Sequence, residues 1–323
     1  MKQILVYHAA AIGDSVLATP VSVSLKKAYP EAKITYATHE SLIPLLRLCP
    51  AIDDYMAIEK VGTVFDIRNA IQKLKPDLLV DLSGSSKSFL QTSMLAKKTL
   101  HYKKQDSAMH AVHNYLDTIS SLALKPADEE IFPTLFISDD EKDKIRKIVA
   151  ARENRRLLAI VPGVGPHRPH RAWPEDNWVG LGKNILWEKD HAVIILGGPD
   201  DRTLCSRIAE KVGDYCFNLA GKLTLPETAA ALSLCDGIVS GDTGPAHISA
   251  AVGTPVVGLY GPTYLDRSGP FGWKKLSLAA SSCKCHNRKN CSITGDASGK
   301  CMKDIPMKLV YGNLSSLFPW NKL

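Results

Sequence analysis

One polar turn carries the residue types that bind phosphate. It lies within residues 236–263, DGIVSGDTGPAHISAAVGTPVVGLYGPT, where a strand pattern ends and a helix pattern begins. A helix N-terminus offers unpaired backbone N–H groups and the positive end of a dipole, which suit an anion. Thr243 adds a hydroxyl, Gly244 leaves room for an anion, and His247 can donate another hydrogen bond. Together with Asp242 they predict a phosphate site, although a capped helix with a core histidine fits the same residues.

Two further loops that follow strand patterns carry acidic residues. Asp14, in AAAIGD, follows the first strand pattern, where a carboxylate can act as general base on a substrate hydroxyl. Asp201, in GGPDDR, occupies a place where acidic groups commonly hold ribose hydroxyls. Each also fits a simpler role at a helix N-terminus, Asp14 as a cap and Asp201 as a partner of the helix dipole.

A third loop, PGVGPHRPHRAWP, supplies fixed positive charge. Arg168 and Arg171 lie in it, after two glycines that make the turn flexible. A guanidinium binds phosphate with two hydrogen bonds and can stabilise a departing diphosphate. The alternative is a surface loop with incidental arginines. The dinucleotide fingerprint G-x-G-x-x-G is absent after the strand patterns, which argues against an NAD-dependent dehydrogenase.

Half of the eight cysteines cluster in a polar segment near the C-terminus. The spacing is C-x-C-x5-C-x9-C, formed by Cys283, Cys285, Cys291 and Cys301. Four thiolates can close a tetrahedral structural metal site, and clustering in an intracellular protein favours metal over disulfides. This spacing is not a standard zinc-finger frame, however, so free thiols are the favoured interpretation. The other four cysteines lie among apolar neighbours and are expected in the core.

The chain is mildly basic, with a formal net charge of +7. No apolar run approaches the ~20 residues of a membrane span, and no signal peptide is recognisable, which predicts a cytoplasmic protein. The densest basic cluster can attract phosphorylated glycolipid or an anionic membrane surface, as a peripheral contact, or can be a solvated face. No nucleic-acid-binding pattern occurs, so nucleic acid is not expected as a partner. The cluster comprises Lys97, Lys98, Lys103 and Lys104.

Strand and helix patterns alternate in the first half, which predicts a parallel sheet covered on both faces. The strand patterns span residues 3–8, 33–37, 54–58, 77–82 and 99–102. The helix patterns span residues 15–28, 41–48, 64–74, 86–96 and 109–122. Residues 124–139 then break the alternation with two prolines and an acidic run. We therefore expect an N-terminal domain at 1–124, a linker at 125–139 and a C-terminal domain at 140–323.

The second domain repeats the alternation. Its strand patterns span residues 157–161, 192–196, 216–218, 236–240 and 254–260. Its helix patterns span residues 140–151, 175–188, 201–212, 225–234, 246–252 and 306–318. The last of these helices is a candidate to pack back on the N-terminal domain. The predicted α/β architecture is two doubly wound, Rossmann-like domains facing a central cleft, lined by loops at the carboxyl ends of the strands.

Four motifs, in order along nearly the whole chain, point to a family. They are GDSVLATP, PG…RAWPEDNW, LGGPDD and SGDTGPAHISAAVGTPVVGLYGPT. In these the chain resembles the heptosyltransferases of lipopolysaccharide assembly, glycosyltransferase family 9. The resemblance implies a GT-B fold and inverting transfer of a heptose from ADP-heptose to a Kdo or heptose of the inner core, without a cofactor or catalytic metal. It also implies that the N-terminal domain holds the acceptor and the C-terminal domain the nucleotide sugar.

The resemblance further implies roles for individual residues. Asp14 matches the catalytic base. Arg171 lies where many members have a lysine that contacts the donor phosphates, and Asp201 lies near a ribose-binding glutamate but is one methylene shorter. The residues that match the donor-binding signature are Asp242, Thr243, Gly244 and His247. Residues 283–302 are similar to the cysteine-bearing tail of many members, and the basic cluster is assigned to the acceptor.

Two other functions fit the same residues. A different GT-B enzyme, such as an epimerase or a transferase of another sugar, would bind a sugar nucleotide in the same place. A non-catalytic protein would bind the nucleotide sugar without turnover, which the presence of Asp14 in a complete N-terminal domain weighs against.

Overall fold

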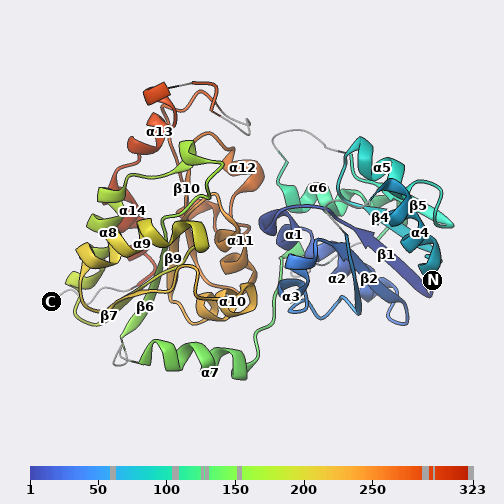
Figure 1. Cartoon of the computed structure of the whole chain (residues 1–323), viewed down its shortest axis with the longest axis horizontal. Helices are drawn as coiled ribbons and strands as arrows, with labels where there is room; N and C mark the ends of the chain where they lie inside the picture. Colours follow the sequence, from blue (N-terminus) through green and yellow to red (C-terminus); the bar gives the residue numbers. More distant parts are fainter. Residues whose placement is uncertain are drawn as a thin grey trace. The chain divides into compact units, whose positions relative to one another are not determined.

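Two compact units divide the chain, Met1–Phe136 and Ile137–Leu323. The computed structural model describes residues 1–58, 63–103, 109–124, 127, 131–150, 155–285, 291–293 and 295–318 (Figure 1). The division falls inside the segment expected to be the linker. Within the described residues, no helix combines the length and the apolar character that crossing a bilayer requires.

The first unit is built on a five-stranded parallel sheet in the order β3-β2-β1-β4-β5. Its strands are β1 (Gln3–Tyr7), β2 (Lys33–Thr38), β3 (Asp54–Ala57), β4 (Leu78–Asp81) and β5 (Lys98–His101). The strand order reverses between β1 and β4, and in such sheets ligands bind beyond the carboxyl ends of the strands at that point. Asp14 lies in the segment after β1, and Ser83 lies just after β4.

The helical elements of this unit connect successive strands. They are α1 (Ile12–Leu17), α2 (Thr19–Ala28), η1 (Glu40–Leu42), α3 (Ile43–Leu46), α4 (Val64–Leu74), α5 (Ser86–Thr92), α6 (Ala111–Asp117) and η2 (Ser120–Leu122). The single helix predicted for residues 15–28 is wrong, because the chain forms two helices that meet at Ala18. Pro20 explains the break, since it lacks an N–H and its ring clashes with the carbonyl four residues earlier.

The second unit has a six-stranded parallel sheet in the order β11-β10-β9-β6-β7-β8. Its strands are β6 (Arg156–Val161), β7 (His191–Ile195), β8 (Cys216–Asn218), β9 (Gly237–Gly241), β10 (Val256–Tyr260) and β11 (Leu278–Ala279). All residues of β7, β9 and β10 are buried. Such unbroken burial is typical of a parallel sheet covered on both faces, and each buried Val, Leu or Ile side chain stabilises the fold by about 1.5–3 kcal/mol.

Of the larger helices of the second unit, α7 precedes the first strand and the others follow strands. They are α7 (Asp139–Ile148), α8 (Glu175–Trp187), α9 (Arg202–Val212), α10 (Leu225–Ser233), α11 (Gly244–Ala251) and α14 (Met307–Ser315). Shorter helical turns are η5 (Pro169–Arg171), η6 (Pro199–Asp201), α12 (Leu265–Ser268), η7 (Lys274–Leu276), η8 (Gly295–Ala297) and α13 (Lys300–Lys303).

The last helix, α14, packs within the second unit. It contacts α8 and strands β9 and β10, and Val310 and Leu314 are buried there (Figure 1). These two residues lie four apart and so share one face of the helix. Gly237 at the start of β9 permits the approach, because a Cβ there would lie 3.3 Å from a methyl carbon of Leu314. That residues 306–318 also pack back on the N-terminal domain stays a prediction.

Candidate functional site

A buried ion pair joins two loops of the second unit. Nη1 of Arg171, in η5, donates to Oδ2 of Asp242, at the end of β9, at 2.8 Å. The side chains are only 7% and 12% exposed. Burial lowers the pKa of Arg171, and the like charge of Arg168 lowers it further. The negative charge of Asp242 opposes this shift. Two residues that the sequence analysis selected from separate loops thus form one ion pair.

The second oxygen of Asp242 faces the helix that follows. Nε2 of His247 lies 3.9 Å from Oδ1 of Asp242, and the His247 side chain is 5% exposed. Asp242 therefore lies between a guanidinium from η5 and an imidazole from α11. A carboxylate in this position contacts the guanidinium and lies beside the imidazole, and its negative charge disfavours direct contact with an anionic ligand.

The start of α11 has the features expected of an anion site. Thr243 is the N-cap residue, but its side chain does not cap the helix. Instead its hydroxyl forms a 2.9 Å hydrogen bond with the Ser240 hydroxyl. Gly244 follows with no side chain to cover the backbone, and the positive end of the helix dipole lies here. Arg171, bound to Asp242 next to this turn, brings its guanidinium to the same region.

Asp201 lies against the loop that follows β6. Its Oδ2 accepts a 2.8 Å hydrogen bond from the Gly198 backbone N–H, so it has a local role at a helix start beside any role in ligand binding. A Cβ at Gly163 would overlap the Asp201 carboxylate, so glycine is required there for the two loops to meet. The structure thus brings Asp201 to the same loop, residues 162–174, that carries Arg171.

The C-terminal cysteine-bearing segment supports that loop. Gly299 has a φ of +69°, and a Cβ there would lie 2.7 Å from the His170 Cα. The indole N–H of Trp173 donates to the Ile305 carbonyl at 3.0 Å. Two separate contacts therefore hold the Arg171 loop against residues 299–305.

The surroundings of the four clustered cysteines bear on the predicted metal site. Cys285 Sγ lies 3.5 Å from Cys291 Sγ and 3.0 Å from the Ser292 hydroxyl. Hydrogen bonds from Ser292 lower the pKa of Cys285 to about 7, whereas burial raises the pKa of Cys301 to about 12. Among the described residues, no group of three or more His, Cys, Asp or Glu side chains is placed to hold a metal ion. The structural metal at Cys283, Cys285, Cys291 and Cys301 is therefore not supported, and all four are free thiols.

In the first unit, Asp14 is held by a tyrosine that the sequence did not reveal. Asp14 lies in the first turn of α1, and Tyr115 of α6 donates its hydroxyl to Asp14 Oδ1 at 3.1 Å. The ring of buried His8 lies 5.1 Å from the Tyr115 ring, and His8 Nδ1 is 3.0 Å from the Tyr36 hydroxyl. Burial lowers the pKa of His8 to about 4, so the imidazole is neutral at physiological pH. His8 is the last residue of the strand pattern at residues 3–8, and that position at the strand end was the available signal for it.

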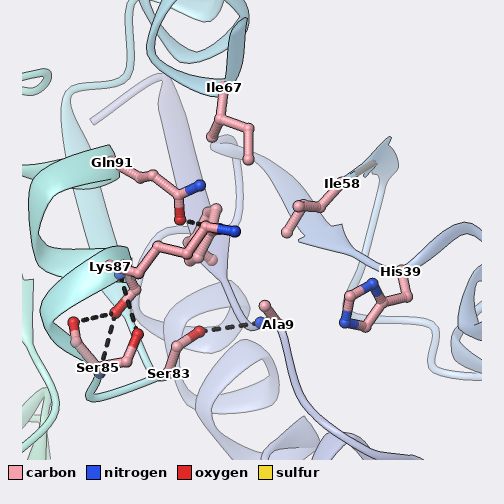
Figure 2. Close-up of a pocket in the computed structure, with 10 residues that line it drawn as sticks. Ala9, His39, Ile58, Ile67, Ser83, Ser85, Lys87 and Gln91 are labelled. Carbon is pink, nitrogen blue, oxygen red and sulfur yellow. Dashed lines mark hydrogen bonds between the residues drawn. The ribbon is translucent and has the colours of Figure 1, made fainter. Parts of the chain in front are cut away.

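A cavity of about 230 Å³ opens at the carboxyl ends of strands β1 to β4. Figure 2 shows Lys87 and Gln91 on one side and His39 and Ile58 on the other. The Tyr7 hydroxyl donates to Gln91 Oε1 at 2.8 Å in its wall. A cation, an imidazole and several hydroxyls suit an anionic, hydroxyl-rich ligand, and the apolar side chains suit the faces of a sugar ring. The lining residues are Tyr7, Ala9, His39, Ile58, Ile67, Ser83, Ser85, Lys87, Ser88 and Gln91.

The lysines of the predicted basic cluster differ in their surroundings. Lys97 Nζ forms a 2.6 Å ion pair with Asp77 Oδ1, which neutralises its charge. Lys98 and Lys103 are exposed, and Lys104 lies outside the described residues. Lys87, which the sequence prediction did not select, is the lysine that lines the cavity.

A family model decides between the functions that fit these residues. The model for glycosyltransferase family 9 (heptosyltransferase) matches residues 72–295, most of the chain. The chain belongs to glycosyltransferase family 9. Membership makes it a glycosyltransferase and confirms the resemblance seen in the sequence motifs. It favours sugar transfer over both the epimerase and the non-catalytic alternatives.

Related proteins and solved structures agree with this membership. The family 9 chain is 28% identical to lipooligosaccharide heptosyltransferase 2 of Haemophilus ducreyi, over 81% of this chain and 84% of that protein. It is 25% identical to lipopolysaccharide heptosyltransferase 3 of Escherichia coli, over 78% and 81%. Its fold matches a family 9 glycosyl transferase of Veillonella parvula with a TM-score of 0.82 at 20% identity, covering 98% and 97%. It matches E. coli ADP-heptose lps heptosyltransferase II with a TM-score of 0.78 at 22% identity, covering 98% of each chain. The GT-B fold is confirmed.

Proposed function

We propose that this family 9 glycosyltransferase moves a heptose from ADP-heptose to a Kdo or heptose of the lipopolysaccharide inner core, with inversion at the anomeric carbon. The observation that carries the proposal is the family match over residues 72–295, which contains every predicted donor-side residue. The relatives named above are heptosyltransferases of lipopolysaccharide or lipooligosaccharide. An E. coli heptosyltransferase of the same fold was solved with ADP.

The second unit binds the donor in this proposal. The start of α11, at Thr243 and Gly244, and the guanidinium of Arg171 bind the diphosphate. Asp201 binds the ribose hydroxyls with the oxygen that does not cap η6. Support comes from the 2.8 Å pair that holds Arg171 beside this helix start. His247, positioned by Asp242, donates a further hydrogen bond to the nucleotide sugar.

The first unit activates the acceptor. Asp14 takes the proton from an acceptor hydroxyl, and the resulting oxygen forms a bond to the anomeric carbon of the heptose. The bond between that carbon and the distal phosphate oxygen breaks, and ADP leaves with the electron pair. Tyr115, bonded to one oxygen of Asp14, leaves the second oxygen for the acceptor.

Charge on the leaving diphosphate is balanced by groups of the protein. Positive charge from Arg171 and backbone N–H groups at the start of α11 are placed where negative charge grows, and preorganised donors of this kind are each worth about 10²–10³ in rate. We therefore propose that transfer needs no divalent cation.

The acceptor binds at the cavity of the first unit. Lys87 meets an acidic group of the core sugar, a carboxylate or phosphate, and Gln91 and His39 meet its hydroxyls. Support comes from His39 Nδ1, which is buried without a hydrogen-bond partner among the described residues. Exposed Lys98 and Lys103 attract the phosphorylated acceptor at the cytoplasmic face of the inner membrane.

The test is transfer by purified protein in a mixture of ADP-heptose and core-truncated lipopolysaccharide. Mass spectrometry should show the acceptor gaining one heptose, together with release of ADP. An isomerised sugar nucleotide formed without acceptor would indicate an epimerase instead. Tight ADP binding with no product on any truncated acceptor would indicate a non-catalytic binding protein.

A further inference from the structure

Four large apolar side chains stand out from the surface of the first unit. Phe65 is 76% exposed, Phe89 52%, Leu90 59% and Met94 93%. They come from α4, from α5 and from the turn after α5. We call these four residues the α4–α5 face. Single exposed apolar residues are ordinary, but neighbouring ones mark a surface that binds something.

Hydrogen bonds show that the residues of this face are neighbours. Nη1 of Arg68, on α4, donates to the Leu90 carbonyl at 2.7 Å and to the Ser93 carbonyl at 3.1 Å. Phe65 lies one helical turn before Arg68, on the same side of α4. Met94 directly follows Ser93. One guanidinium therefore joins the part of α4 that carries Phe65 to the segment that carries Leu90 and Met94.

These side chains are not needed for the core of the unit. On α4, Ile67 and Ile71 are the buried residues, and Phe65 lies well away from them around the helix. On α5, the buried residues are polar, namely Ser88, Gln91 and Thr92. Leu90 lies on the opposite side of that helix. Both helices thus direct apolar side chains to solvent while other residues fill the interior.

The segment that carries the face is strongly basic. Residues 63–103 contain seven Lys and Arg residues but only three Asp residues, in a chain whose net charge is +7. Two of the three carboxylates add little negative charge to the surface of this segment, because Asp77 pairs with Lys97 and Asp81 is buried. Lys87 and Lys98 are exposed. Exposed apolar side chains and exposed lysines on one segment are the combination that binds the interface of an anionic bilayer.

We propose that the α4–α5 face docks the enzyme on an anionic phospholipid bilayer. The proposal rests on the proposed function, in which the acceptor is a glycolipid of the inner membrane. Apolar side chains enter the headgroup region, and exposed lysines of the same segment other than the cavity-lining Lys87 pair with lipid phosphates. The same two helices line the acceptor cavity with Ile67, Lys87 and Gln91, so docking here brings the cavity to the surface that carries the acceptor.

Sedimentation with vesicles tests the docking. Wild-type protein should bind vesicles of phosphatidylglycerol and phosphatidylcholine, and should not bind pure phosphatidylcholine. The triple variant Phe65→Ser, Leu90→Ser, Met94→Ser should lose binding at least tenfold. Phe89 is left in place because its ring packs 4.7 Å from His101. The matched control is Trp187→Ser on α8, which removes an apolar side chain that is 84% exposed in the second unit and should change nothing.

Activity measurements separate this proposal from the proposed function. With a short, water-soluble core oligosaccharide as acceptor, the triple variant should transfer heptose at the wild-type rate. With acceptor embedded in anionic vesicles, its rate should fall about as much as its binding. Unchanged vesicle binding by the triple variant overturns the docking proposal alone, as does wild-type dimerisation that the triple variant abolishes. Absence of transfer by wild-type protein to the soluble acceptor would overturn the proposed function, whatever the vesicles show.

Discussion

Arg171 and Asp242 lie 71 residues apart in sequence and form a 2.8 Å ion pair with almost no exposure to solvent. The pair fixes the only guanidinium that family resemblance assigns to the donor phosphates. Because Asp242 also lies beside His247, one carboxylate determines the position of two donor-side groups. Removing that carboxylate should therefore affect donor binding even though Asp242 itself repels a phosphate.

Asp242→Asn should weaken ADP binding. The variant leaves the buried Arg171 charge without its partner, and breaking a buried pair from one side typically costs about 3–5 kcal/mol. We expect the dissociation constant of ADP, measured by calorimetry, to rise at least tenfold, together with a lower melting temperature. The control Asp200→Asn, at an exposed position of η6, should change neither. Wild-type affinity in Asp242→Asn would contradict the positioning role.

Asp14→Asn should abolish transfer and leave ADP binding intact. Loss of a general base commonly costs about 10²–10⁴ in rate, and the donor site lies on the other unit. Tyr115→Phe should have a smaller effect on kcat, about tenfold, because a hydrogen bond to a charged group is worth about 1.5–3 kcal/mol. Its KM for the donor should not change. Steady-state kinetics with varied donor measure both variants, and full turnover in Asp14→Asn would exclude Asp14 as the base.

Sequence patterns located every described strand except the two-residue β11, because most of the others are short runs rich in apolar residues. The pattern at residues 216–218 coincides with β8, and most others differ from the observed strands by one or two residues. The patterns selected each residue that is proposed to bind the nucleotide sugar, but they did not predict the pairing of Arg171 with Asp242. That pairing depends on where η5 lies relative to β9, which no local pattern encodes. The contact of Tyr115 with Asp14 was not predicted for the same reason, since 101 residues separate the two and the packing of α6 on α1 brings them together.

Chelation should leave the transfer rate unchanged. Arg171 and the start of α11 supply the positive charge that a divalent cation supplies to a diphosphate in other transferases. Initial rates measured after dialysis against EDTA should equal those of untreated enzyme, and added Mg²⁺ should not raise them. Activity that disappears with EDTA and returns with Mg²⁺ would contradict this expectation.

Gly299→Ala should loosen the Arg171 loop. The new Cβ meets the His170 backbone at a positive φ of +69°, and such strain costs about 1–3 kcal/mol. Gly213→Ala is the matched control, because Gly213 has a φ of +101° but nothing lies within 4 Å of its added Cβ. Both variants should unfold at a lower temperature than wild type. Only Gly299→Ala should also bind ADP more weakly, and equal ADP affinity in the two variants would show that the cysteine-bearing segment does not position the loop.

The acid stability of the second unit should depend on Glu175. Hydrogen bonds from Arg207 and then from Lys211 lower the pKa of Glu175 to about 2, at distances of 2.7 and 2.9 Å. A pKa that is lower in the folded state than the unfolded value of 4.5 stabilises the protein fully above pH 4.5. This stabilisation is lost as the pH falls from about 4.5 to about 2. Melting temperatures measured between pH 6 and pH 3 should therefore fall less steeply in Glu175→Gln than in wild type.

Glu210→Gln, at an exposed position of α9 that forms no ion pair among the described residues, should follow the wild-type curve. Identical slopes for Glu175→Gln and wild type would show that the interaction of Glu175 with Arg207 and Lys211 does not contribute to stability.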